Sequence, residues 1–143
     1  KMLFGDKSRE DLQVTFKVVK NPGISLNDNA VKTKIIELIN RFFSIDNWNF
    51  GDTFYFQELA SYIINEMSPD IVSIVIVPKQ ATQSFGSLFE IKSEPDEIFI
   101  STAEVKDVEI ISENTAFELQ AAGKVVTSVP AKTIGITSSS NGG

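Results

Sequence analysis

Residues 31–78 read "VKTKIIELINRFFSIDNWNFGDTFYFQELASYIINEMSPDIVSIVIVP", and this stretch decides the fold because it holds two helical patterns followed by an apolar strand. In the first pattern the apolar side chains recur every three or four positions, which predicts an amphipathic helix over residues 30–43. The second pattern predicts a helix from residue 56 or 57 to 67, ended by Ser68-Pro69-Asp70. Valine and isoleucine then fill both faces of residues 71–77, which predicts a buried strand.

The flanking segments add strands to this unit. Residues 12–18 alternate apolar and polar side chains, as a half-buried strand does, and Asn27, Asp28 and Asn29 are candidates to cap the first helix. Residues 88–91 and 97–101 flank the turn "KSEPD", which predicts a hairpin or meander, and a last strand starts at Val108 after a short helical turn. We therefore expect an α+β domain over residues 1–112, with two helices on one face of a small, mainly antiparallel sheet.

The character of the chain changes after residue 112. Residues 113–143 carry scattered apolar residues and a polar Ser/Asn/Gly end, so we expect an extended C-terminal arm. Ordering backbone costs about 1–2 kcal/mol per residue, so such an arm needs a surface to lie on. We expect that surface to belong to a partner or a neighbouring copy, with short strands at 124–129 and 133–137 added to a sheet edge; a lattice contact is the alternative.

Composition excludes several classes of function. Thirteen basic and nineteen acidic residues give a net charge of −6, and no basic stripe is present that would neutralise the phosphates of a nucleic acid. Without cysteine or histidine the chain has no disulfide, no thiolate or imidazole metal site and no histidine-based triad. No apolar run reaches the length of a membrane span, and no phosphate loop or nucleophile motif occurs. We expect no enzymatic activity, cofactor, metal or small-molecule substrate. Because the chain begins with Lys1, we expect a fragment of a longer protein.

Five of eleven phenylalanines, the only tryptophan and one of two tyrosines lie in residues 42–56. The phenylalanines that continue the helical and strand patterns are expected in the core, whereas Trp48 and Phe50 lie among asparagines in a predicted loop, where large rings often anchor an interface. Two alternatives for Trp48 remain: burial against the domain's own core, or stacking on a sugar with Asn47, Asn49 and Asp52 as hydrogen-bonding partners. Asp46 and Gly51 suit a calcium loop, but the other ligand positions carry no carboxylate.

Acidic residues cluster in and around the turn between the two predicted hairpin strands, at Glu90, Glu94, Asp96 and Glu97. Two carboxylates at a suitable separation can perform acid/base chemistry or hold magnesium. Charges at a hairpin tip also keep strand edges soluble, and no nucleophile or phosphate-binding loop lies nearby. We therefore interpret this cluster as a solvated turn.

The order of these features, residues 31–78 followed by "DEIFISTAEVKDVEII" at 96–111, resembles the C-terminal region of the baseplate J-like family, the wedge proteins of contractile phage tails and related injection machines. In that family a helix leads to a glycine-containing turn, a second helix and a buried strand, and an acidic residue precedes a later strand. The matching positions here are 31–43, Gly51, 59–67, 71–77 and 97–100. The sequence is most similar to wedge proteins of T-even-type phages.

The resemblance implies a structural role in the virion, in the tail baseplate, for a late protein assembled in the host cytoplasm. Copies pair as homodimers, wedges join into a ring around the tail hub, and the ring rearranges when the tail contracts. It implies neither a catalytic residue nor a cofactor. The partners we expect are a second copy and other wedge proteins; the rival interpretation is a carbohydrate- or receptor-binding module. The candidate interface residues are Trp48, Phe50, Tyr55, Phe117, Val125, Val126, Ile134 and Ile136.

Overall fold

A computed structural model describes residues 1–80, 90–123 and 125–130, which form an α+β fold as predicted. Short 3-10 helices are labelled η. The elements in chain order are β1 (Met2–Leu3), η1 (Glu10–Leu12), β2 (Val14–Lys20), α1 (Asp28–Phe42), η2 (Ile45–Asn47), β3 (Thr53–Tyr55), α2 (Phe56–Met67), β4 (Ile71–Pro78), β5 (Glu90–Lys92), β6 (Ile100–Ser101), η3 (Val105–Asp107), β7 (Val108–Ile110), α3 (Glu113–Ala122) and β8 (Val126–Ser128).

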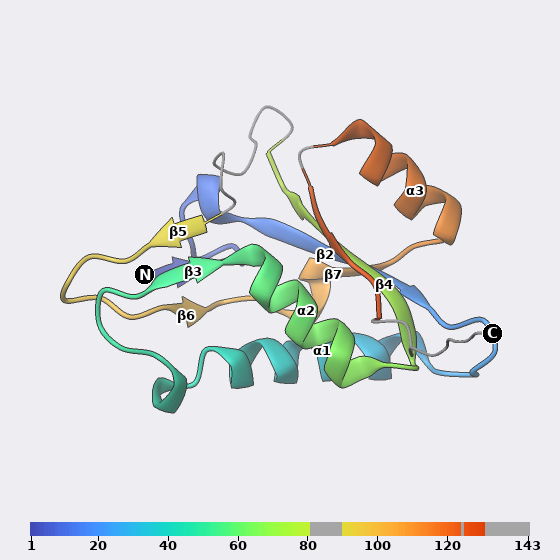
Figure 1. Ribbon diagram of the computed structural model, residues 1–143, viewed down its shortest axis with the longest axis horizontal. Helices are drawn as coiled ribbons and strands as arrows, with labels where there is room; N and C mark the ends of the chain where they lie inside the picture. Colours follow the sequence, from blue (N-terminus) through green and yellow to red (C-terminus); the bar gives the residue numbers. More distant parts are fainter. Residues whose placement is uncertain (81–89, 124, 131–143) are drawn as a thin grey trace, which may run out of the picture.

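The central sheet has the strand order β7-β2-β4-β8 (Figure 1). β2 and β8 flank β4, and both run antiparallel to it, whereas β7 runs parallel to β2. In the register of the β2–β4 pair, Phe16 lies opposite Ile76 and Val18 opposite Ile74. Since side chains alternate along a strand, this register places all four on the same face of the sheet. The strand predicted over residues 12–18 is β2, which begins at Val14, two residues later than expected, because Leu12 belongs to η1.

Helices α1 and α2 cover that face together, as the apolar spacing predicts. Asn27 caps α1, and its side-chain oxygen accepts hydrogen bonds from the backbone N–H groups of Asn29 and Ala30. The buried stripe of α1 packs in one core with the apolar face of α2 and the inner side chains of β2 and β4. Both helices thus bury one face and leave the other to solvent.

Helix α3 lies on the opposite face of the sheet (Figure 1), where Ala116 packs against Val19 and Val75. Over residues 113–122 the structure therefore differs from the expected extended arm, whereas β8 confirms a short strand within the predicted range 124–129. Ser112 caps α3 by accepting a hydrogen bond from the backbone N–H of Thr115, and β8 pairs with β4 of the same chain. This cap, which sequence reasoning missed, is the local signal for a helix here. Residues 131–143, including the predicted strand at 133–137, lie outside the described residues.

Two small sheets close one end of the core. β3 pairs with β5 in antiparallel fashion, and β1 pairs with β6 in parallel. The predicted hairpin between residues 88–91 and 97–101 is therefore wrong: its two strands pair with β3 and β1 and not with each other. Backbone hydrogen bonds hold the connecting segment against residues 51–52 and so favour the pairing of β5 with β3. Ser93 donates from its backbone N–H to the carbonyl oxygen of Asp52, and Gly51 donates from its own N–H to that of Glu97.

The N-terminal segment approaches residues 101–103 very closely. The backbone N–H of Thr102 donates to the carbonyl oxygen of Leu3 at 2.9 Å, and the N–H of Gly5 donates to the Thr102 hydroxyl at 3.0 Å. A Cβ atom on Gly5 would lie 2.0 Å from the carbonyl oxygen of Thr102. Glycine is therefore required at this position by the space available.

Candidate functional site

The structure buries much of Trp48, which the sequence placed at an interface. Its indole stacks on Phe43 with ring centroids 5.4 Å apart and planes at 23°. The indole N–H donates to the carbonyl oxygen of Phe42 at 2.6 Å, so its polar atom is satisfied within the chain. These contacts agree with the alternative in which Trp48 packs against the domain's own core, because the end of α1 supplies both a ring and a hydrogen-bond acceptor for it. Trp48 is half-buried against the core.

Phe50, in contrast, is exposed as expected, with 67% of its surface accessible. It precedes Gly51, which adopts a positive φ of 80° and donates its N–H to the carbonyl oxygen of Glu97 at 3.1 Å. Met2 and Ile100, which are cross-strand partners in the β1–β6 sheet, are also about half exposed. We call Met2, Phe50 and Ile100 the apolar tip: Met2 and Ile100 are paired, and the hydrogen bond from Gly51 to Glu97 joins the loop that carries Phe50 to the segment that leads to Ile100.

Tyr55 lies on β3 and is 41% exposed, so this candidate also remains accessible. It is the cross-strand partner of Glu90, and the negative charge of that carboxylate, followed by partial desolvation, raises the pKa of the Tyr55 hydroxyl. The residue alternates with buried Phe54, as the strand period predicts. Its hydroxyl faces an acidic environment.

A cavity of about 440 Å³ opens beside Trp48. Three rings line it, from Phe42, Trp48 and Tyr62, and two carboxylates lie at its wall, Asp52 and Glu58. The ring centroids of Phe42 and Trp48 are 5.7 Å apart and those of Phe42 and Tyr62 are 5.4 Å apart, so the rings form one continuous wall. Of the possible ligand contacts proposed from the sequence, Asn47, Trp48 and Asp52 line this cavity and Asn49 is not among its lining residues. Tyr62 and Glu58, which come from α2, were not predicted.

The C-terminal interface candidates divide into three groups. Phe117 on α3 is 63% exposed, and Val125 is half-buried against the α3 face of the sheet. Val126 is only 4% exposed, because it lies opposite Ile76 in the β4–β8 pair and packs into the core of its own chain. It is therefore not available to a partner. Ile134 and Ile136 lie outside the described residues.

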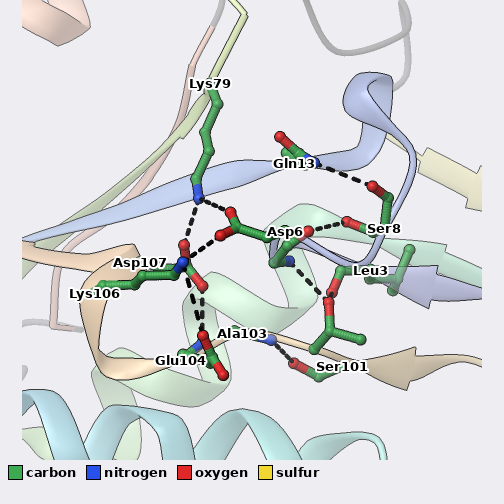
Figure 2. Close-up of polar contacts among 12 residues, drawn as sticks. Leu3, Asp6, Ser8, Gln13, Lys79, Ser101, Ala103, Glu104, Lys106 and Asp107 are labelled. Carbon is green, nitrogen blue, oxygen red and sulfur yellow. Dashed lines mark hydrogen bonds and ion pairs between the residues drawn. The ribbon is translucent and has the colours of Figure 1, made fainter.

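A network of charged side chains joins the N-terminal segment, the end of β4 and η3 (Figure 2). Asp107 has no solvent exposure and accepts a hydrogen bond from the Lys79 ammonium, while its other oxygen accepts the backbone N–H of Glu104 at 2.8 Å. Lys79 also lies 3.6 Å from Asp6, which pairs with Lys106. This network cannot be predicted from local sequence patterns, because its members are up to 101 residues apart; the local signal is the reciprocal cap between Glu104 and Asp107.

The outer pair of this network is solvent-exposed. The hydrogen bond and charge of Lys106 hold the pKa of the Asp6 carboxyl below its ordinary value, and Asp6 correspondingly raises the pKa of the Lys106 ammonium. Lys79 and Asp107 form the inner pair, in which each charge is compensated. The arrangement ties three distant segments together, and each oxygen of the Asp107 carboxylate accepts one hydrogen bond from them.

The acidic turn forms a local structure of its own. Glu97 accepts a hydrogen bond from the backbone N–H of Glu94 at 2.8 Å, and this bond is the main reason that the pKa of Glu97 is lowered. Glu94 and Asp96 are exposed. Within residues 1–80, 90–123 and 125–130, no three histidine, cysteine or acidic side chains come together as a metal site would require.

No helix in the described part of the chain is both long and apolar enough to cross a lipid bilayer. In comparisons with known proteins, no protein-family model, no curated protein and no solved structure matches the chain.

Proposed function

We propose that this chain is a non-catalytic structural component of a contractile-tail baseplate wedge, which self-associates and docks to other wedge proteins. The proposal rests on the resemblance to the baseplate J-like family and, within that family, to the wedge hinge protein of T-even-type phages. Helices at 28–42 and 56–67, a positive-φ glycine at 51 and a strand at 71–78 lie at the positions that carry the resemblance. The agreement between these elements and the order of elements in the family supports the proposal.

The apolar tip is the observation that carries self-association. Met2, Phe50 and Ile100 expose 48%, 67% and 53% of their surfaces, and hydrogen bonds join the segments that carry them. Burying a large apolar side chain fully is worth about 1.5–3 kcal/mol, so covering the remaining exposed surface of all three favours a contact with a second copy. A self-complementary contact of this kind is how most homodimers form.

Light scattering at increasing protein concentration tests this proposal. We expect the wild-type mass to rise toward a dimer, and Phe50→Ser to remain a monomer over the same range because the most exposed ring of the tip is lost. Phe117→Ser is the matched control, since it removes an almost equally exposed ring from α3. A monomeric wild-type chain, or a dimer abolished by Phe117→Ser and retained by Phe50→Ser, would refute an interface at the apolar tip.

A further inference from the structure

We propose that the cavity beside Trp48 binds an organic cation, an ammonium or guanidinium group. This inference goes beyond the proposed function, because it concerns a different surface from the apolar tip. Its basis is the combination of aromatic faces and uncompensated carboxylates around one opening of about 440 Å³. Cations are attracted to the faces of aromatic rings, most strongly to tryptophan, and to carboxylates in the same site.

The rings are held in place before any ligand arrives. The indole of Trp48 is fixed by its hydrogen bond to the Phe42 carbonyl oxygen and by its stacking on Phe43. The ring of Phe42 lies between those of Trp48 and Tyr62, at 5.7 and 5.4 Å from them. A ligand therefore does not have to order the aromatic wall, which lowers the entropic cost of binding.

The charged side chains that line the cavity are both acidic. Neither Asp52 nor Glu58 forms an ion pair with any lysine or arginine in the described part of the chain, and the described lining residues include no basic side chain. One oxygen of Asp52 accepts the backbone N–H of Asn49 at 2.8 Å, which orients that carboxylate. The net charge of −6 adds to the negative potential.

These features favour a cation over a sugar. Ionised carboxylates only accept hydrogen bonds, and the amide group of Asn47 already donates to the Arg41 carbonyl oxygen and the Ser44 hydroxyl. Besides the hydroxyls of Thr53 and Tyr62, which can donate or accept, the wall thus offers carboxylate acceptors and aromatic rings. An ammonium or guanidinium, which donates and carries positive charge, matches this surface better than a neutral polyol does.

Tryptophan fluorescence reports on this site directly, because Trp48 is the only tryptophan. We expect a saturable change in its emission on titration with tetramethylammonium, Nα-acetyl-argininamide or spermidine, and none with methyl glucoside or with sodium chloride at matched ionic strength. Tighter binding of the blocked arginine than of spermidine would assign the natural cation to a protein side chain, and the reverse order to a free polyamine.

Two glutamine variants test the role of charge. Glu58→Gln should weaken binding about fivefold, the scale of one exposed ion pair. Glu66→Gln is the matched control: it removes the same charge from the same helix, away from the cavity, and should leave the affinity unchanged. The proposal is overturned if no cation gives a saturable signal, if Glu58→Gln binds as tightly as the wild type, or if methyl glucoside binds better than the cations. None of these outcomes depends on whether the chain dimerises through the apolar tip.

Discussion

Replacing Lys79 with methionine should destabilise the fold strongly, because it leaves a buried charge without its partner. The Asp107 side chain has no exposure, and among the described residues its oxygens accept hydrogen bonds from Lys79 and from the backbone N–H of Glu104. Breaking a buried ion pair by removing one member costs about 3–5 kcal/mol. That loss is a large share of the roughly 5–15 kcal/mol by which a domain is stable. With a urea m value of about 2 kcal/mol/M, the unfolding midpoint falls by about 2 M.

Urea unfolding followed by Trp48 emission measures this effect, and a double variant tests its cause. Lys79→Met combined with Asp107→Leu removes both charges, so it should be more stable than Lys79→Met alone despite carrying an additional substitution. Lys106→Met makes the same change in the exposed pair and should shift the midpoint little. If the double variant loses the sum of the two single losses, or if Lys79→Met behaves as Lys106→Met does, the reasoning about the buried charge fails.

Four further predictions concern single positions. Asn27→Ala should lower stability by about 1 kcal/mol in thermal unfolding followed by circular dichroism, since two N–H groups lose their cap. Phe43→Ala should cost about 3–5 kcal/mol in urea, because a buried ring at the centre of the aromatic cluster is lost. Gly5→Ala should destabilise far more than Gly23→Ala in the same assay, since its Cβ would meet a backbone oxygen at 2.0 Å, whereas that of Gly23 meets a side-chain atom at 3.3 Å. The pKa of Asp6 is lowered in the folded state, so its ionised carboxylate stabilises the fold at pH values above the ordinary aspartate pKa of about 4. The difference in urea midpoint between wild type and Asp6→Asn should therefore persist at neutral pH and disappear as the pH falls below that value.

Several elements were predictable from the sequence because their signals are local. The helices α1 and α2 and the strand β4 lie within one or two residues of their predicted positions, since an apolar stripe and a cap are properties of neighbouring residues. The α3 helix carries such a signal too, in the Ser112 cap, but its apolar stripe is weak because Ala116 is its only buried residue. A weak apolar stripe predicts an arm more readily than a helix.

The sequence by itself determined the α+β class, the two-helix face and the buried central strand, together with the lack of histidine and cysteine chemistry. Only the tertiary structure decided which strands pair, because alternation sets the face of a strand and carries no information about its neighbour. It also decided that Trp48 packs beside α1 with its N–H satisfied, and that Lys79 meets Asp107. These contacts join residues that are distant in sequence or separated by a turn, and their energies depend on burial, which exists only once the chain has folded.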